Sequence, residues 1–190
     1  WVTAPYFNCP KAILEVMDSI SDGAIFEPAT FDEFNSLVRE RLATIVREAT
    51  ENLDRAWHRR GETGCFPLAS CLINDCLAKG QDSDCGGARY NWVENSFVGL
   101  GNLVDSLVAI KHLVYQSQDL TPGITGIQDD LCGLRQILQE DFEGDERLRQ
   151  LILNCIPSYG NDDDAADAHA VEWAEFLSET TSANIVGLYP

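Results

Sequence analysis

The chain has 190 residues, 45% of them hydrophobic, which is enough for one sizeable core. It carries 31 Asp and Glu residues against 13 Lys and Arg, a formal net charge of −18. Such a surface repels nucleic acid and anionic membranes, so general nucleic-acid binding is excluded and no membrane partner is expected.

No apolar run approaches the roughly 20 residues of a membrane span. The opening residues, "WVTAPYFNCP", lack the pattern of a signal peptide. Because the first residue is Trp1 rather than Met, the numbering is expected to start inside a longer chain.

The cysteine content favours a reducing, cytoplasmic compartment over a disulfide framework, because the number is odd and no signal peptide accompanies it. The seven cysteines are Cys9, Cys65, Cys71, Cys76, Cys85, Cys132 and Cys155. Four of them fall between residues 65 and 85, which raises the question of a metal site. No CxxC pair occurs, however, and a helix would place Cys71 and Cys76 on different faces. Small buried residues are therefore the favoured interpretation, with no metal bound.

Two helices are predicted in the first third of the chain. Residues 9–20 form a short helix that carries a proline near its start. Residues 30–60 form the clearest helix, which begins with a capping box of Thr30 and Glu33. Glycines 61 and 64 are expected to end it. Its core-facing stripe, spaced by three and four, consists of Phe31, Phe34, Val38, Leu42, Ile45, Ala49, Leu53 and Trp57.

The middle of the chain predicts a helix, a turn and a strand. Residues 66–80 read as a helix that is buried on most sides and closed by Gly80. Gly86 and Gly87 follow a polar turn, and the aromatic and β-branched residues 88–93 favour a strand. A lone strand would lack a partner, whereas a strand buried on both faces belongs in a parallel sheet or barrel covered by helices. This indicates that the chain is part of a larger α/β body.

Helices dominate the remainder. A helix buried nearly all round begins at Gly99, and its narrow polar stripe holds Asn102, Asp105 and His112. Further helices are expected within residues 121–142, 144–156 and 158–179, and residues 180–190 are expected to be extended. Asp162, Asp163 and Asp164 could suggest a divalent cation, but they lack the alternation of an EF-hand loop. Placement at a helix N-terminus, where the dipole favours anions, is the preferred interpretation.

The stretch "GGARYNWVENSFVGLGNLVDSLVAIKHLVY", residues 86–115, resembles a signature of the glycyl radical enzyme family, the pyruvate formate-lyase-like group. That family reads GGA-x-YN, then a glycine, then a DSLxAIK-like helix. The matching residues are 86–91, Gly99 and 105–111. The resemblance continues in "FPLASCLINDCLAKGQD" and "DFEGDERLRQLILNCIPSYGNDDD", so it covers roughly residues 58–190.

The resemblance implies a helix-rich α/β fold, as part of a ten-stranded α/β barrel of the glycyl radical enzyme type. In that family two parallel five-stranded half-barrels surround a cysteine loop and a glycine loop. A glycyl radical, installed after translation by a radical S-adenosylmethionine activating enzyme, oxidises the cysteine to a thiyl radical. The thiyl radical abstracts hydrogen from a small organic substrate, which then loses a bond. The implied activity is that of an anaerobic radical lyase, decarboxylase or dehydratase, and the full enzyme is expected to be a homodimer.

The 190 residues contain neither the Gly-Cys loop nor the Arg-Val-x-Gly-Tyr loop of that family. Cys65, in "TGCFPL", is superficially similar to the first, but its place in the order differs. Residues 1–190 are therefore expected to be a single segment of the barrel domain, without the glycine-radical domain and without any cofactor of their own. Alone, the segment should be inactive; its partners would be the remaining segments of the parent enzyme and the activating enzyme. The alternative is a non-catalytic half-barrel or split subunit that serves as an interaction or structural module.

Three residues around the strand are the candidate site. The resemblance makes Glu94, at the cavity end of the strand, the candidate catalytic carboxylate, since arylacetate-type decarboxylases of the family use a glutamate for such work. The alternative is a loop carboxylate paired to an arginine or capping the next helix. Tyr90 and Asn91 are candidate substrate-binding residues; alternatively they are structural, with the Asn amide tying strands together.

The other polar residues of the chain receive structural interpretations. Asp105 is read as a buried tether and Lys111 as a helix-end charge. The three histidines are scattered, and none has a Cys or Asp at the spacing of a catalytic dyad. They are His58, His112 and His169.

Overall fold

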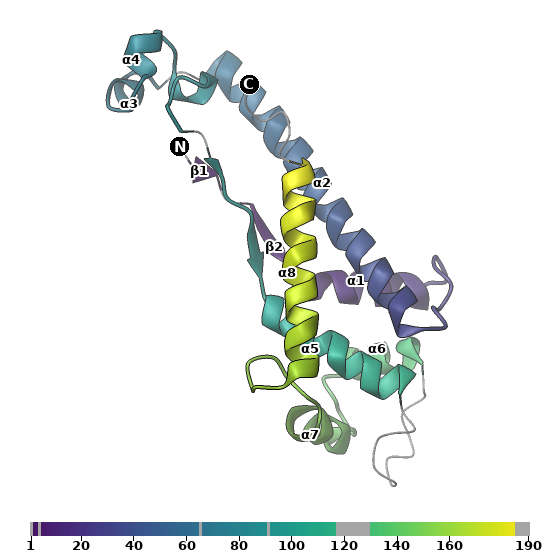
Figure 1. The fold of residues 1–190 in the computed structure, drawn as a ribbon. Helices are drawn as coiled ribbons and strands as arrows, with labels where there is room; N and C mark the ends of the chain where they lie inside the picture. The colour runs from purple at the N-terminus through teal and green to yellow at the C-terminus, as the bar shows by residue number, and fades with distance from the viewer. Residues whose placement is uncertain (1, 4, 65, 91, 117–129, 185–190) are drawn as a thin grey trace. The chain divides into compact units, whose positions relative to one another are not determined.

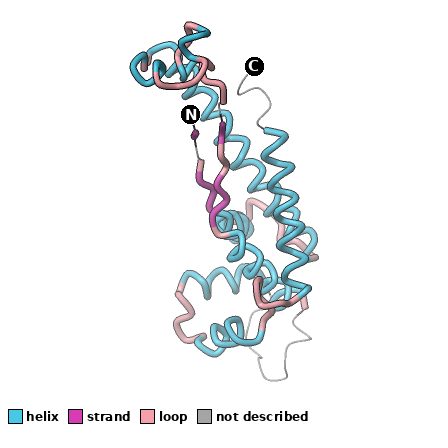
Figure 2. Tube along the Cα trace, turned by 60° about the vertical axis from the view of Figure 1, so that its left-hand side comes forward, coloured by secondary structure: helices cyan, strands magenta, loops and turns pink. Residues whose placement is uncertain are grey.

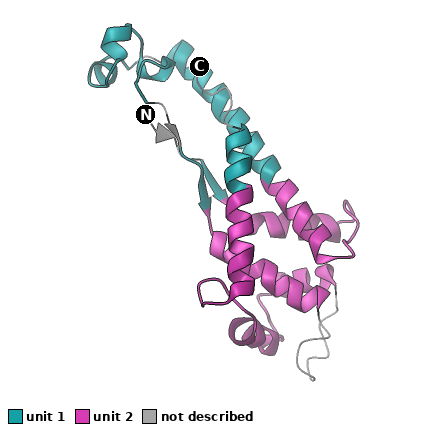
Figure 3. Cartoon of the chain, in the orientation of Figure 1, with its two compact units in different colours: residues 1–7, 43–97, 177–190 teal, residues 8–42, 98–176 magenta. Residues whose placement is uncertain are grey.

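The computed structural model describes residues 2–3, 5–64, 66–90, 92–116 and 130–184 (Figure 1). The chain divides into two compact units (Figure 3). Unit 1 comprises residues 1–7, 43–97 and 177–190, and unit 2 comprises residues 8–42 and 98–176. Helices make up most of the described chain, and strands occur only as short pieces (Figure 2). The fold is thus helix-rich, as the sequence predicts.

In chain order the elements are β1 (Val2–Thr3), β2 (Tyr6–Asn8), α1 (Cys9–Ser21), α2 (Phe31–Thr63), α3 (Pro67–Cys71), α4 (Cys76–Lys79), the 3₁₀-helix η1 (Ser83–Cys85), β3 (Trp92–Val93), β4 (Ser96–Val98), α5 (Leu100–Ile110), the π-helix η2 (Lys111–Tyr115), α6 (Leu131–Gln139), α7 (Glu146–Cys155) and α8 (Asp164–Asn184).

Local capping explains where the first two helices begin. Asn8 precedes α1, and its side chain accepts a hydrogen bond from the Lys11 N–H at 3.3 Å, while the proline lies in the first turn. At α2 the predicted capping box is confirmed. The Glu33 N–H donates to Thr30 Oγ1 at 3.2 Å, and the Thr30 N–H donates to Glu33 Oε2 at 3.2 Å.

Helix α2 runs slightly further than predicted, because Gly61 lies within the helix rather than ending it. Its stripe is fully buried over the first four turns, where Phe34, Val38, Leu42 and Val46 have no exposed surface. Beyond them the stripe residues are only partly buried. Val46, rather than the predicted Ile45, continues the buried face.

The core of unit 2 forms where helical faces with three-and-four spacing meet. Helix α1 buries Cys9, Ala12, Ile13, Val16, Met17 and Ile20. It packs against α5 and α6, and Arg135 on α6 donates to Asp18 on α1 at 2.7 Å. Helix α5 packs against α8 through a cluster of Val104, Val108, Ala166 and Ala170. The predicted helix after Gly99 is confirmed, and its last turn is the π-helix η2.

The prediction of one buried helix over residues 66–80 is wrong. The segment forms two short helices, α3 and α4, separated by a turn in which Asp75 has a φ of 76°. Asparagine and aspartate tolerate this left-handed conformation because their side chains bond locally. Here the Asp75 carboxylate accepts two hydrogen bonds from Arg89, at 2.7 and 2.9 Å. Leu68, Leu72 and Leu77 are 80%, 83% and 69% exposed.

The strands differ in extent from the prediction but pair as expected. Residues 88–90 are not strand; β3 occupies only Trp92–Val93, and β4 follows as a second strand. Strand β3 pairs with β1 in parallel, with Val2 opposite Trp92 and Thr3 opposite Val93. The other pair is β2 with β4. Parallel pairing between segments about 90 residues apart is what a barrel strand covered by helices requires.

The C-terminal helices agree with the sequence apart from one boundary. Helix α7 ends before the proline at 157, as predicted. The start of α8 confirms the interpretation of the aspartates, since Asp163 Oδ1 accepts from the N–H groups of Ala165 and Ala166 at 3.0 and 3.3 Å. Helix α8 extends to Asn184, so residues 180–184 are not extended. None of the helices among the described residues has the length and apolarity to cross a membrane.

Candidate functional site

The Gly-Gly turn ahead of β3 is determined by backbone crowding. A Cβ atom at Gly87 would lie 2.1 Å from the carbonyl oxygen of Gln81 and 2.8 Å from that of Asp82. The Gly87 N–H donates to the Asp82 carbonyl at 2.9 Å, so the two chain segments are held at this separation. Gly86 meets no such crowding, but its φ of 85° favours glycine. Crowding therefore accounts for the glycine at position 87, and the positive φ accounts for the glycine at position 86.

Asp82 anchors this turn from the other side. Its carboxylate accepts hydrogen bonds from the Asp84 N–H at 2.9 Å, the Phe66 N–H at 2.8 Å and the Ser70 hydroxyl at 2.8 Å. These donors, with the Asp84 N–H foremost, hold the pKa of Asp82 below its ordinary value. The carboxylate therefore joins α3 and η1 around the start of the motif.

An ion pair between a buried carboxylate and a half-exposed arginine connects the same turn to the end of α2. Asp84 is 3% exposed, and its Oδ2 lies 2.9 Å from a guanidinium nitrogen of Arg60. The Trp57 indole N–H donates to the Asp84 carbonyl at 2.9 Å. Since both partners lie on α2, the turn is fixed to a long helix before β3 begins.

The predicted site residues lie at the two ends of β3. Tyr90 precedes the strand and is 66% exposed. Glu94 follows the strand directly, in the connection between β3 and β4, and is also exposed. Asn91 lies outside the described residues. The strand thus separates Tyr90 from Glu94 rather than bringing them together.

Asn95, next to Glu94, is a residue that sequence reasoning missed. Both polar atoms of its amide are buried, and neither has a hydrogen-bond partner among the described residues. A buried amide without partners costs free energy, so it marks a position where a further polar group is needed. The sequence offers little signal of this, because an Asn in a loop is ordinarily solvated.

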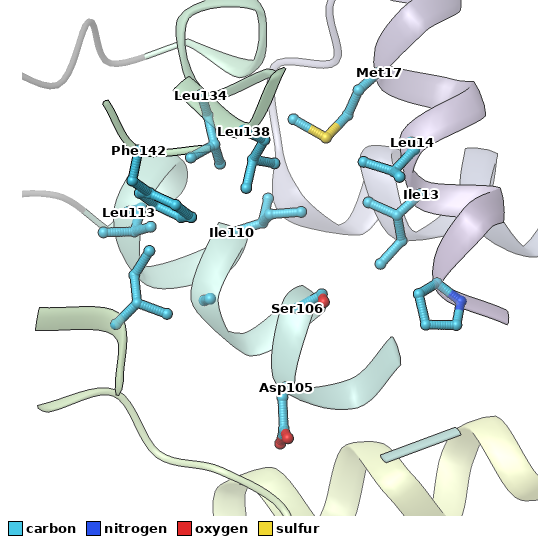
Figure 4. A pocket seen from close by; sticks show the side chains of 13 residues that line it. Ile13, Leu14, Met17, Asp105, Ser106, Ile110, Leu113, Leu134, Leu138 and Phe142 are labelled. Carbon is cyan, nitrogen blue, oxygen red and sulfur yellow. The ribbon is translucent and has the colours of Figure 1, made fainter. Parts of the chain in front are cut away.

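The apolar pocket in unit 2 is separate from these residues (Figure 4). Its volume is about 290 Å³, and its walls come from α1, α5, η2, α6, α7 and Phe142. Asp105 and Ser106 contribute the polar groups. Figure 4 shows Asp105 pointing away from the apolar cluster, and its Oδ1 accepts the Tyr159 N–H at 2.7 Å. The pocket therefore offers apolar contact rather than acid–base chemistry. Asp105 is a tether, as predicted, but it is partly exposed rather than buried.

The histidines and the motif lysine have defined contacts. Lys111 Nζ lies 3.3 Å from His169 Nε2 on α8, so this lysine is more than a charge at a helix end. His58 Nδ1 lies 3.3 Å from an Asp54 carboxylate oxygen one turn earlier, a pair that the prediction of unpaired histidines overlooked. The neighbouring Asp54 carbonyl, then its carboxylate, raises the pKa of the exposed His58.

The His, Cys, Asp and Glu side chains of the described residues could in principle supply metal ligands or reactive thiols. Within the described ranges, no three His, Cys, Asp or Glu side chains gather as metal ligands. The six cysteines that the structure describes are all thiols, and Cys65 lies outside the described residues. Burial raises the pKa of the Cys9 thiol to about 11, which keeps it protonated at neutral pH.

Comparison with known proteins identifies the family. The family profile described as pyruvate formate lyase-like matches residues 6–185. The trans-4-hydroxy-L-proline dehydratase of Clostridioides difficile is 42% identical over 101 residues, covering 53% of this chain and 12% of that protein. An isethionate sulfite-lyase of Nitratidesulfovibrio vulgaris is 43% identical over 147 residues, covering 74% of this chain and 16% of that protein.

A solved structure gives the same result. The crystal structure of hydroxyproline dehydratase from Clostridioides difficile, with trans-4-hydroxy-L-proline bound, superposes with a TM-score of 0.76 at 30% identity. The match covers 94% of this chain and 23% of that one, so the chain spans less than a quarter of the relative's length. The profile matches nearly the whole chain, and the superposition covers almost all of it. Both point to the same family as the Gly-Gly motif in the sequence. The chain belongs to the pyruvate formate lyase-like family of glycyl radical enzymes.

Proposed function

We propose that residues 1–190 are a single segment of the barrel domain of a longer glycyl radical enzyme, a lyase, decarboxylase or dehydratase that acts on a small organic substrate. The observation that carries the proposal is the superposition of 94% of the chain on 23% of a hydroxyproline dehydratase. The relatives include both dehydratases and sulfite-lyases, which break C–O and C–S bonds respectively. The proposed reaction is radical cleavage: a hydrogen atom is first removed from one carbon of the substrate, and a bond next to that carbon then breaks.

In the longer enzyme, the glycyl radical supplies hydrogen abstraction through a cysteine, and neither group is part of this segment. Glu94 is proposed to give or accept the proton that accompanies bond cleavage, since its carboxylate follows a parallel strand at its C-terminal end. Tyr90 and Asn91 are proposed to bind substrate ahead of the same strand. Glu94 is exposed in this segment, so its role requires that other parts of the enzyme enclose it.

The test uses the protein at its natural length, activated anaerobically by a radical S-adenosylmethionine enzyme. Glu94→Gln keeps the shape and hydrogen bonding of the side chain but removes its titration. It should lower kcat by on the order of 10²-fold. The glycyl radical signal in electron paramagnetic resonance should stay the same. Glu143→Gln, at an exposed glutamate after α6, is the matched control and should retain wild-type kcat. Wild-type turnover by the Glu94→Gln variant would refute the assignment.

The second candidate is a non-catalytic half-barrel that serves as an interaction module. The exposure of Leu68, Leu72 and Leu77 favours a chain that needs a partner, which suits either function. The intact mass of the natural protein distinguishes them. A chain long enough to carry both radical loops supports the enzyme, and a natural product of about this length supports the interaction module.

A further inference from the structure

The end of α5 contacts α8 through one polar pair. Lys111 is the first residue of the π-helical turn η2, and its Nζ lies 3.3 Å from Nε2 of His169. The same ammonium group lies 5.3 Å from the centroid of the Phe31 ring. His169 packs against that ring edge-on, with the centroids 5.9 Å apart. Lys111 and His169 therefore contact each other and also contact the same aromatic ring, that of Phe31.

The geometry assigns a protonation state to His169. An ammonium group only donates, so Nε2 must accept and the neutral ring carries its proton on Nδ1. Nδ1 faces the Glu172 carboxylate at 3.8 Å, and this carboxylate also lies 3.5 Å from Arg39 on α2. The charged groups around the imidazole are thus Lys111 and Arg39, both cations, and Glu172, which is largely exposed. The His169 side chain is only 18% exposed.

Protonation of His169 would remove this contact. Nε2 would lose the lone pair that accepts from Lys111, and two cations would face each other within hydrogen-bond distance. Burial, followed by the Lys111 charge, accordingly lowers the pKa of His169 from its ordinary value of 6.5. A lowered pKa means that the folded state disfavours the added proton. The contact is thus intact at neutral and higher pH, and is lost as the pH falls below 6.5 and through the folded-state value.

The turn that Lys111 opens is an uncommon one. π-Helical turns are rare and require compensating contacts. The other end of η2 is held by Tyr115, whose ring lies 6.1 Å from Phe31 and 6.5 Å from Phe34, and whose hydroxyl donates to the Pro28 carbonyl at 3.4 Å. Loss of the Lys111 contact removes the hydrogen bond between the first residue of η2 and α8, while Leu113 stays buried and Tyr115 still holds the other end.

We propose that Lys111 and His169 form a proton-sensitive latch between η2 and α8, closed while His169 is neutral and opened when it is protonated. The latch lies wholly within unit 2 and does not depend on the proposed catalytic role of Glu94. It couples the family's DSLxAIK-like helix, through its lysine, to the packing of α8.

Hydrogen–deuterium exchange of the natural-length protein tests the latch. Protection of peptides that cover residues 107–116 and 165–173, corrected for intrinsic rates, is compared at about pH 8 and about pH 5.5. Loss of one hydrogen bond predicts a fall in protection of about two- to tenfold at the lower pH. In His169→Gln, which keeps an acceptor but does not titrate, that fall should disappear. His58→Gln, at an exposed histidine in unit 1, should behave as wild type.

A second measurement stands independently of the Gln variant. Exchange of the imidazole C2 hydrogen, followed by mass spectrometry, reports the titration midpoint of each histidine. Lys111→Met keeps the apolar stem over Phe31 but removes the charge, so the His169 midpoint should rise toward 6.5. An unchanged midpoint in Lys111→Met would overturn the proposal. So would an equal pH response in wild type and His169→Gln, or the lack of any response in wild type.

Discussion

Replacement of Gly87 by Ala tests whether the motif turn is as tightly packed as the structure shows. The new Cβ would lie 2.1 Å from the Gln81 carbonyl oxygen, and a tolerable separation is at least 3.0 Å, so the backbone must move by about 0.9 Å. That shift breaks the Gly87–Asp82 backbone hydrogen bond and disturbs the three donors to the Asp82 carboxylate. Overpacking together with one or two lost hydrogen bonds predicts a local destabilisation of about 2–4 kcal/mol.

Gly61→Ala is the matched control. Gly61 lies inside α2, and a Cβ there meets Cys85 Sγ at 3.4 Å, which is ordinary contact. Because glycine is a poor helix residue, this change should be neutral or stabilise by up to about 1 kcal/mol. Amide hydrogen exchange across residues 66–90 of the natural-length protein measures the effect of Gly87→Ala and of Gly61→Ala. Gly87→Ala should exchange on the order of 100-fold faster than wild type, and wild-type protection in Gly87→Ala would show that the turn is not crowded.

Three further outcomes are expected. Residues 1–190 alone should associate or aggregate, because exposed strand edges and apolar side chains lack their cover; a monodisperse monomer with cooperative unfolding, measured by light scattering and urea titration, would contradict this. The same 190 residues, treated anaerobically with an activating enzyme and S-adenosylmethionine, should give no glycyl radical signal in electron paramagnetic resonance. The motif turn should loosen as the pH falls below about 3.8 and through the lowered folded-state pKa of Asp82, since protonation removes a hydrogen-bond acceptor. Asp82→Asn should show weaker amide protection of residues 66–70 already at pH 7. Equal protection in wild type and Asp82→Asn would argue against Asp82 as the anchor of the turn.

The sequence predicted those features that depend on neighbouring residues. Thr30 and Glu33 are three residues apart and form the reciprocal capping bonds that their types and spacing indicate. Asp163 caps α8 by accepting from the N–H groups of Ala165 and Ala166. The buried stripe of α2 follows from its period through Leu42. The capping bonds each span fewer than five residues, and the stripe follows from a spacing of three and four, so both could be predicted from the local sequence.

Features that depend on distant residues were predicted less well. Residues 66–80 have the apolar content of a buried helix, yet the chain turns at Asp75, where Arg89, 14 residues later, pairs with the carboxylate. Strand β3 is shorter than its aromatic sequence suggests, since among the described residues Trp92 and Val93 are the ones that pair with β1. The barrel was predicted from the family resemblance. Local sequence patterns alone indicated no more than that the chain is part of a larger α/β body.

Two features of this part of the chain could not be predicted from sequence, one an exposed apolar group and the other a buried polar group. Leu68, Leu72 and Leu77 are apolar and exposed, whereas the amide of Asn95 is polar, buried and without a partner among the described residues. A buried amide without a partner costs free energy, and neither feature can be predicted from the residue type alone. The proposal that this chain is a segment of a longer enzyme would explain both, because the remaining segments would cover the leucines and supply a partner for the amide; the chain covers 23% of the hydroxyproline dehydratase that it superposes on. Glu94 lies directly before Asn95 and is exposed, so the two neighbouring side chains have opposite environments in the described structure.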